Sequence, residues 1–258
     1  MLTLAACGGN DPARPDAPSC MAVADPHDED GDGIYDACDN CPAATNPTQS
    51  DIGESGGMQF PDGVGDACDP RPTAGGDDVR AFYAFASDAE ASAFTGSGWT
   101  ISGDAAHAVG AATWTTTHPV ASDGFLVAAE LSSVAFGAQG TLAITLDGDG
   151  ISTGESCTLA AQMLTVAEGG GATNSVALAS PIDSSKPLTL MAWRVFVLVN
   201  NARVAQTICR VKIGGVTRET MIQLTDDVVS GTYTIAASDT TVDMTSLSVY
   251  TGPGPKTP

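Results

Sequence analysis

The segment 28–39, DEDGDGIYDACD, constrains what this chain can fold into more than any other part of the sequence. It places carboxylates at positions 1, 3, 5, 9 and 12 of a twelve-residue loop and a glycine at position 6. A calcium ion takes about six to eight oxygen ligands, and a loop with side-chain oxygens at alternate positions and a sharp turn at position 6 wraps one such ion. The pattern therefore predicts a calcium loop. Its ligands are five aspartate side chains and one backbone carbonyl: Asp28, Asp30, Asp32, Asp36 (directly or through water), Asp39 and the carbonyl of Ile34.

A second, shorter ladder, DGVGDACD at 62–69, follows the stretches NCP at 40–42 and NPTQ at 46–49. Cysteines, prolines, an asparagine, a glutamine and aspartates in this order resemble the thrombospondin type 3 repeat, over about residues 20–70. The resemblance implies a segment with little regular secondary structure that wraps calcium ions as its core. It also implies a second ligand set: Asp62, Asp66, Asp69 and the carbonyl of Val64.

The second ladder departs from the repeat pattern just before Asp62, where two further aspartates belong. This chain has Met58 and Phe60 there, inside an apparent insertion. Two outcomes stay open: Asp51 and Glu54 fold back to replace the missing ligands, or the loop binds calcium poorly. Composition alone favours a solvated, disordered acidic linker. The spacing argues against that alternative, because a random acidic tract would not also place cysteines between two ladders.

Acidic residues concentrate near the start of the chain. The 258 residues carry a net charge of −21, and residues 1–78 hold 16 acidic side chains against Arg14 and Arg71, a net charge of −14. Nucleic acid is excluded as a partner, because phosphate contacts need a basic patch, and cations are the expected counterpart. The sequence has no apolar run of about 18 residues, so we expect no segment to span a membrane.

Seven cysteines and an extracellular family resemblance indicate an oxidising compartment. The sequence LAACGG around Cys7 resembles the bacterial lipobox, whose cysteine is lipidated after signal-peptide cleavage. We therefore expect an extracytoplasmic protein, lipid-anchored at a bacterial outer membrane or cell surface, or secreted. Six residues before Cys7 are too few for the apolar region of a signal peptide, so we expect a misassigned or trimmed start. A chance match with an unmodified thiol is the alternative.

Six cysteines then remain for three bridges. Sequential pairing, as the thrombospondin resemblance implies, gives Cys20 with Cys38, Cys41 with Cys68, and Cys157 with Cys209. The last bridge closes a loop of about 50 residues and is expected to contribute about 4 kcal/mol in the chain-entropy model. A redox site at 38–41 is disfavoured because acidic flanks raise a thiol pKa. A zinc site is disfavoured because paired CxxC spacing is absent.

The texture changes to short β-type runs after 71–78, a linker by its Pro and Gly content. The predicted strands are 79–85, 98–102, 106–109, 113–117, 125–131, 142–146, 156–166, 175–179, 188–199, 204–213, 219–224, 231–237 and 241–250. So many short strands predict a mainly β fold, an antiparallel two-sheet sandwich or jelly roll behind the irregular calcium-wrapped segment. The expected domains are 1–19 lipobox and tether, 20–70 calcium repeats, 71–78 linker, and 79–258 sandwich.

Two of these strands carry more specific expectations. The apolar run 188–199 predicts a buried strand rather than a helix, because it is rich in β-branched residues. The run 241–250 alternates, with Val242, Met244 and Tyr250 on one face, and predicts a half-solvated strand. The segments 231–235 and 242–250 resemble, in architecture, the closing strands of a laminin-G or concanavalin-like lectin module.

No pair of catalytic acids emerges from the sequence. Jelly-roll glycosidases usually place two carboxylates on alternate residues of one strand. Glu130 lies on a predicted strand, but its alternate neighbours are Ala128 and Ser132, so we expect a solvent-facing residue and no enzyme. The three histidines are isolated in the sequence and are predicted to be surface or loop residues: His27, His107 and His118.

The leading hypothesis is a calcium-binding, non-enzymatic surface lipoprotein that presents a lectin-like sandwich to a glycan or surface protein. Aromatic side chains stack on sugars, although a chain with few aromatics needs most of them in its core. The candidates are Tyr83, Trp99, Trp114, Trp193 and Tyr233. The sequence DGDG at 147–150 is read as a hairpin turn rather than a further calcium site. The alternatives are a secreted glycan-active enzyme with a calcium-binding spacer, and a purely structural spacer.

Overall fold

The computed structural model describes residues 27–52, 61–73, 75–122, 124–147, 154–200, 202–224 and 230–252. The predictions for Cys7, Cys20 and Glu54 lie outside these residues, as does most of the turn expected at 147–150. Within the described residues, no helix is long and apolar enough to cross a membrane.

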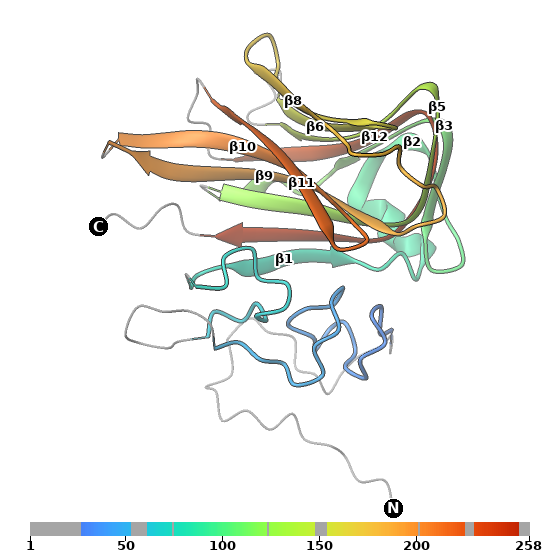
Figure 1. Cartoon of the computed structure of the whole chain (residues 1–258). Helices are drawn as coiled ribbons and strands as arrows, with labels where there is room; N and C mark the ends of the chain where they lie inside the picture. The colour runs from blue at the N-terminus through green and yellow to red at the C-terminus, as the bar shows by residue number, and fades with distance from the viewer. Residues whose placement is uncertain are drawn as a thin grey trace, which may run out of the picture.

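Strands make up nearly all the regular structure, as the sequence predicted (Figure 1). In chain order the elements are β1 (Asp78–Tyr83), the 3-10 helix η1 (Asp88–Ala93), β2 (Phe94–Ile101), β3 (Ala106–Thr116), β4 (Val120–Ala121), β5 (Gly124–Asp147), β6 (Glu155–Ala160), β7 (Met163–Glu168), β8 (Thr173–Ala177), β9 (Leu188–Val199), β10 (Ala202–Ile213), β11 (Val216–Gln223) and β12 (Ser230–Gly252). All described pairings are antiparallel, which confirms the predicted fold class.

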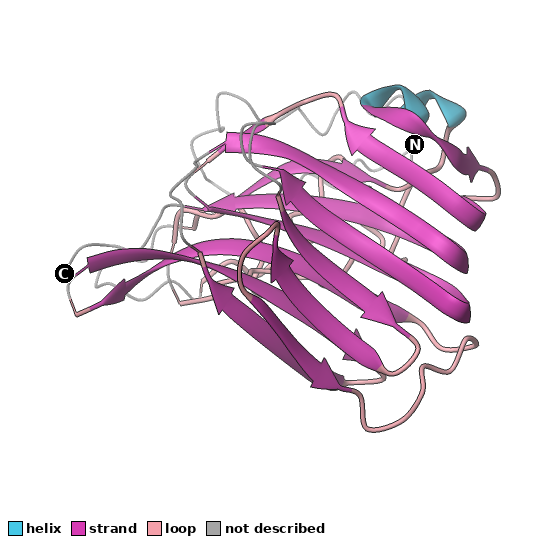
Figure 2. Ribbon diagram, turned by 90° about the horizontal axis from the view of Figure 1, so that it is seen from above, coloured by secondary structure: helices cyan, strands magenta, loops and turns pink. Residues whose placement is uncertain are grey.

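The strands pack in two layers (Figure 2). The long strands β5 and β12 belong to both layers. The first part of β5, 125–131, pairs with β9, and its last part, 142–146, pairs with β6. In β12, the first half pairs with β3 and 247–251 pairs with β1. One layer therefore runs β11-β10-β9-β5-β12-β1, and the other runs β8-β7-β6-β5-β12-β3-β2.

Both shared strands bend where the sequence predicted a break. Gly137 and Gly140 lie in the middle of β5 against Asp239 of β12. A Cβ on Gly137 would lie 2.3 Å from the Asp239 carboxylate, and one on Gly140 would lie 2.6 Å from its carbonyl oxygen. Only glycine allows this close approach. The prediction of separate strands at 125–131 and 142–146 is therefore wrong, because the chain bends there without leaving the sheet.

The opposite error occurs at 156–166, which was predicted as one strand. The chain turns at Ala161 and Gln162 and forms the β6–β7 hairpin, with Ala160 opposite Met163. Apolar alternation continues through the hairpin, and neither turn residue is the Gly, Asn or Asp that usually marks such a turn. The sequence pattern therefore hides it. The run 188–199, by contrast, is the predicted buried strand, β9.

One apolar core fills the space between the layers. Its largest fully buried side chains include Phe85, Phe196, Leu142, Ile144, Leu159, Leu164, Tyr233 and Ile235. The predicted disulfide between Cys157 of β6 and Cys209 of β10 is confirmed and joins the two layers through this core. A buried ion pair does the same, since Arg194 Nη1 of β9 lies 2.8 Å from Glu155 Oε1 of β6.

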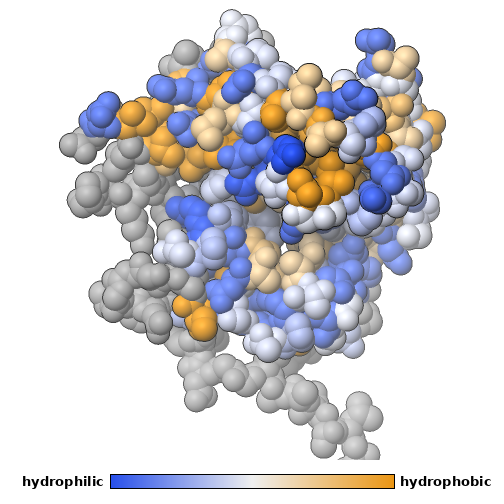
Figure 3. All heavy atoms as spheres, in the orientation of Figure 1, coloured by the Kyte–Doolittle hydropathy of each residue, from blue (hydrophilic) through white to orange (hydrophobic). Residues whose placement is uncertain are grey.

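The acidic module, the described parts of residues 27–77, lies beside β1 as an irregular chain (Figure 1). Hydrophilic residues dominate its visible surface, whereas hydrophobic residues gather over the sandwich (Figure 3). Val64 is fully buried against Leu126, Ala128 and Tyr250, on the face of the sheet that points away from the sandwich core. The module therefore covers part of the outer face of the sandwich.

This contact corrects the prediction for 241–250. The register of β12 shifts between Met244 and Ser246, so that Val242 and Met244 face the core while Tyr250 faces the acidic module. Residues 246–250 are all buried, because the core covers one face and the module the other. A half-solvated strand was expected from alternation alone, which shows neither the bulge nor the covering module.

Candidate calcium sites

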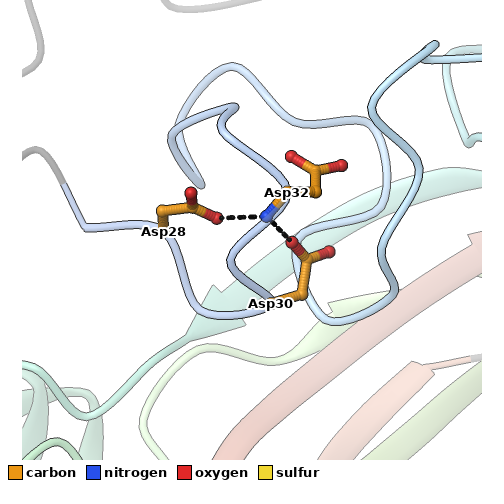
Figure 4. A group of neighbouring side chains, drawn as sticks. All are labelled: Asp28, Asp30 and Asp32. Atoms are coloured by element: carbon orange, nitrogen blue, oxygen red, sulfur yellow. Dashed lines mark hydrogen bonds between the residues drawn. The ribbon is translucent and has the colours of Figure 1, made fainter.

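Three aspartates of the first loop gather around one point. One carboxylate oxygen from each of Asp28, Asp30 and Asp32 lies within 4.8 Å of the others. Figure 4 shows the three side chains converging from a single loop, with the Asp32 N–H donating to Asp28 Oδ1 at 3.2 Å and to Asp30 Oδ1 at 3.0 Å. Gly33 has a φ of 96°, which supplies the sharp turn expected at position 6.

Asp30 keeps one oxygen available for a cation. Asp30 Oδ2 is buried and has no hydrogen-bond partner among the described residues. Burial, together with the negative charges of Asp32 and Asp39, raises the pKa of Asp30 to about 6. A buried carboxylate oxygen without a donor is costly, and a bound cation removes that cost. The donor set, hard oxygens from three carboxylates, fits calcium.

The other predicted ligands of the first loop lie outside this group of three. Asp39 Oδ1 accepts hydrogen bonds from the Cys41 N–H at 2.7 Å and from Gln49 Nε2 at 2.8 Å. The Ile34 N–H donates to Asp32 Oδ1 at 2.9 Å, which places the Ile34 peptide next to the cluster. A role for the Ile34 carbonyl as a ligand stays a prediction.

The second loop repeats the hydrogen bonds of the first from a different starting point. In the first loop, the Gly33 N–H donates to Asp28 Oδ2 at 2.9 Å. In the second, the Gly63 N–H donates to Asp51 Oδ2 at 2.8 Å. Asp51 thus folds back to the place that Asp28 has in the first loop, and the insertion lies between Asp51 and Asp62.

Asp36 and Asp66 also correspond, and both tie the start of a loop to its end. Asp36 Oδ2 lies 2.8 Å from His27 Nδ1, and Asp36 Oδ1 accepts from the Glu29 N–H at 2.9 Å. Asp66 Oδ2 accepts from Ser50 Oγ at 2.7 Å. These carboxylates hold the loops closed and lie outside both groups of three that the structure brings together among its described residues.

A second group of three forms from Asp62, Asp69 and Asp77, again with one oxygen from each within 4.8 Å of the others. Asp62 and Asp69 were predicted ligands, whereas Asp77 was not, because it lies in the segment 71–78 that composition marks as a linker. Its place follows from contacts in the structure: Asp62 Oδ2 accepts from the Gly76 N–H fourteen residues on, as Asp32 Oδ2 accepts from the Asn46 N–H, and this puts Asp77 beside the second loop.

The second group is more buried than the first. Asp69 is 9% exposed, and its Oδ2 is buried without a hydrogen-bond partner among the described residues. Burial and the neighbouring Asp77 raise the pKa of Asp69 to about 7. Arg71 Nη2 lies 2.7 Å from Asp77 Oδ1, so one positive charge already partly balances this cluster. Val64, predicted to offer its carbonyl, buries its side chain against the sheet.

The disulfide between Cys41 and Cys68 joins the two loops, as predicted. The Gly65 N–H donates to the Asn40 carbonyl at 3.0 Å, so the loops also share a backbone hydrogen bond. The expected partner of Cys38, Cys20, lies outside the described residues, and that pairing stays a prediction.

Two of the three histidines are not isolated. His27 contacts Asp36, as above, and His107 Nδ1 lies 2.7 Å from Asp243 Oδ1. Nε2 of His107 lies 2.8 Å from the Ser102 carbonyl. The sequence does not show the contact of His107 with Asp243, because β3 and β12 meet only in the folded sheet.

Glu130 is not the solvent-facing residue that was expected. Its Oε2 accepts from Thr189 Oγ1 at 2.8 Å, and burial raises its pKa. The structure also places Glu155 directly opposite Glu168 in the β6–β7 hairpin, a carboxylate pair that sequence reasoning missed. Both are buried and Glu155 pairs with Arg194, so neither is presented to a polymeric substrate.

Three of the five aromatic candidates for sugar stacking are buried in the core: Trp99, Trp114 and Tyr233. Tyr83 is partly exposed and stands at the end of an aromatic row, with its ring centroid 4.9 Å from that of Phe94. It lines a hollow of about 510 Å³, open to solvent, together with Arg80, His118 and Tyr233. The Tyr233 hydroxyl in this hollow is buried without a hydrogen-bond partner among the described residues.

No family model matches the sequence, and no curated protein matches it. Among solved structures, an endo-β-1,3-glucanase from Pyrococcus furiosus is similar with a TM-score of 0.51 and 8% identity, over 69% of this chain and 96% of its own. A protein with a galectin-like fold from Bacillus subtilis has a TM-score of 0.49 and 10% identity, over 69% of this chain and 97% of its own. A legume lectin-like domain from Entamoeba histolytica has a TM-score of 0.46 and 12% identity, over 62% of this chain and 90% of its own. At such identities the likeness concerns the fold alone, a lectin-like β-sandwich.

Proposed function

We propose that this protein is a calcium-binding, non-enzymatic surface lipoprotein whose acidic module is built around calcium and whose lectin-like sandwich binds a glycan. The observation that carries the calcium role is the first cluster. Asp28, Asp30 and Asp32 converge within 4.8 Å, and Asp30 Oδ2 is buried without a donor among the described residues. The resemblance to thrombospondin type 3 repeats supports the same conclusion.

Calcium in this proposal replaces an apolar interior. Of the described residues of the acidic module, only Cys41, Pro42 and Val64 are buried apolar side chains. Crowded carboxylates repel one another, and a divalent cation removes that repulsion, so binding energy becomes folding energy. Extracellular calcium modules bind at about 10⁻⁴ to 10⁻³ M, and the affinity of the first loop is expected in that range.

The experiment that tests the calcium role is a calorimetric calcium titration of the full chain, with protease protection of the acidic module read in parallel. Asp30→Asn is expected to weaken binding at the first cluster by about tenfold, since it removes a ligand charge. Asp88→Asn, in the exposed first turn of η1, changes charge equally and is expected to leave binding unchanged. Equal protection of the wild-type module in chelator would contradict the proposal.

The hollow beside Tyr83 is the candidate glycan site of the sandwich. A partly exposed aromatic ring stacks on a sugar, and polar groups around it fix orientation. Tyr83 supplies the ring, and Arg80 and His118 supply the polar groups. Glycan-array binding by the full chain is expected to be lost in Tyr83→Ala and kept in Tyr35→Ala, an exposed tyrosine of the acidic module. Loss in both variants would remove Tyr83 as the site.

The lipoprotein role is supported by the sequence around Cys7, and two disulfides support an extracytoplasmic compartment. Labelling with a radioactive fatty acid is expected in wild type and not in Cys7→Ser. The runner-up function is a glycan-active enzyme, because the fold also occurs in a glucanase. A screen for polysaccharide hydrolysis separates the two: product formation that is lost in Glu130→Gln would replace the binding role by catalysis.

A further inference from the structure

The second cluster joins two parts of the molecule that the first cluster does not. Asp62 and Asp69 belong to the acidic module, whereas Asp77 directly precedes the first residue of β1. Asp62 Oδ2 accepts hydrogen bonds from the Gly76 N–H at 2.7 Å and from the Asp77 N–H at 2.6 Å. The start of the sandwich is therefore held by the same carboxylates that gather in the second loop.

An independent feature points to a cation at this junction. Asp69 is 9% exposed, and its Oδ2 lies buried in the cluster without a hydrogen-bond partner among the described residues. Asp77 is 4% exposed, and its side-chain partners are the Arg71 guanidinium and the Asp69 carboxyl group. Three clustered carboxylates, with Asp62 partly exposed and Asp69 and Asp77 buried, and one neighbouring arginine leave an excess of negative charge, which a divalent cation would balance.

The cluster lies next to the contact between the module and the sheet. Val64, two residues after Asp62, is fully buried against Tyr250 and Leu126. Arg71 and Asp77 line a hollow of about 300 Å³, open to solvent, together with Trp193 and Tyr250. An ion at the second cluster thus acts within reach of the residues that hold the module on the sheet.

The first cluster lacks a residue from the sandwich. Glu29 of the first loop forms a hydrogen bond with Thr245 of β12, but the clustered carboxylates, Asp28, Asp30 and Asp32, all come from the loop itself. Ile34, which corresponds to Val64, is only partly buried and is not part of the apolar contact with the sheet. The two clusters therefore have different consequences for the molecule, although their hydrogen-bond patterns match.

We propose that a calcium ion held by Asp62, Asp69 and Asp77 fastens the acidic module to the sandwich, with Asp77 as a ligand from outside the repeat. The first ion orders a loop, whereas this second ion sets how the module sits on the outer face of the sheet. The inference rests on the proposed calcium function and adds to it a junction site that controls the docking of the two parts.

The test is a calcium titration of the full chain that is monitored both by calorimetry and by tryptophan fluorescence. Wild type is expected to show two binding events, one of which changes the emission of Trp193 beside the junction. Asp77→Asn is expected to weaken that event by about tenfold or more and to remove the emission change, because it removes one ligand charge. Asp78→Asn, the adjacent carboxylate that pairs with Arg80, is the matched control and is expected to change neither.

Three further variants separate the possible outcomes. Trp193→Phe is expected to lose the emission change and keep both binding events, whereas Asp30→Asn is expected to keep the emission change at an unaltered midpoint. Asp62→Asn provides a second junction variant if Asp77→Asn misfolds, which near-ultraviolet circular dichroism of the buried Trp99 and Trp114 would reveal. Two events and an intact emission change in both junction variants would overturn the junction site and leave the calcium function standing. No calcium uptake by wild type would overturn both.

Discussion

The interior of the β-sandwich and the interior of the acidic module are built from opposite kinds of side chain. The sandwich buries one continuous apolar core between two layers and adds the disulfide between Cys157 and Cys209. The described part of the module buries the apolar side chains of Cys41, Pro42 and Val64 and otherwise presents carboxylates to its own backbone N–H groups. The interior of the sandwich is stabilised by apolar burial, whereas the acidic module contains buried carboxylate oxygens that a bound cation would stabilise.

The difference teaches that the same chain carries two kinds of stability with different controls. Apolar burial responds to temperature and packing, whereas a carboxylate cluster responds to calcium and to pH. The two kinds meet where Val64 packs on Tyr250 and Asp77 enters the second cluster.

The largest expected effect is on the sandwich disulfide. Replacing Cys157 and Cys209 by serine is expected to lower the free energy of unfolding of the sandwich by about 4 kcal/mol, because the bridge spans 52 residues. Chemical denaturation with and without calcium measures this change in the free energy of unfolding. The same exchange at Cys41 and Cys68 is expected to weaken calcium binding and to leave the sandwich transition in place. An equal shift of the sandwich in both pairs of variants would break the comparison.

A cavity in the apolar core is the next largest effect. Ile144 is fully buried, and Ile144→Ala is expected to destabilise the sandwich by about 2–5 kcal/mol through lost burial and the cavity left behind. The loss should be the same in calcium and in chelator. Val109→Ala, at an exposed position of β3, is the control and is expected to cost little. A cost that depends on calcium would show that the two interiors are not separate.

The pH dependence should have opposite signs with and without calcium. The folded-state pKa values of Asp30 and Asp69 are raised to about 6 and about 7 from the ordinary aspartate value of 3.8, mainly by burial. The metal-free folded module therefore holds more protons than its unfolded form, and its stability falls as pH rises from about 4 to 7. Calcium displaces those protons, so its affinity should rise over the same window, by up to about tenfold per pH unit for one proton.

Calorimetry at about pH 5, 6 and 7.5, in buffers that differ in ionisation enthalpy, measures both the calcium affinity and the number of protons released on binding. The sandwich transition serves as the internal control, because its core contains neither aspartate. Calcium affinity that stays level across this range would contradict the assignment of these carboxylates as ligands.

The smallest expected effect concerns Arg71. Its guanidinium pairs with Asp77, so it competes with a cation at the second cluster. Arg71→Gln is expected to raise calcium affinity there by a few-fold, on the order of 1 kcal/mol for a partly exposed charge. Arg80 is exposed and pairs with Asp78, and Arg80→Gln should have no effect. Weaker calcium binding in Arg71→Gln would mean that the arginine positions Asp77 rather than opposing the ion.

Most of the fold was predictable because strand patterning is local. Composition alone predicts a buried strand such as 188–199. The pairing of Cys157 with Cys209 followed from the family resemblance and from keeping each bridge within one domain. The errors in strand boundaries occur where contacts with a neighbouring strand determine whether the chain stays in the sheet. β5 stays in the sheet through Gly137 and Gly140 because Asp239 lies against them, and nothing within β5 itself reveals this contact.

The candidate sites divide in the same way. Asp28, Asp30 and Asp32 converge because alternate residues of one short loop face one point, which spacing alone predicts. Asp51 reaches its place across an insertion, and Asp77 reaches the second cluster because the chain folds back after Asp69. Glu130 was misjudged for a related reason: its strand was predicted, but the pairing that sets Thr189 of β9 beside its carboxylate was not.

The sequence by itself determined the strand-rich sandwich, the first carboxylate cluster and the bridges Cys41–Cys68 and Cys157–Cys209, because each depends on short-range patterning or on the family resemblance. The tertiary structure decided the bends of β5 and β12, the turn of Tyr250 toward the acidic module and the arrival of Asp77 beside Asp69. These features depend on contacts between residues far apart in the chain, and their energies exist only once both partners are in place.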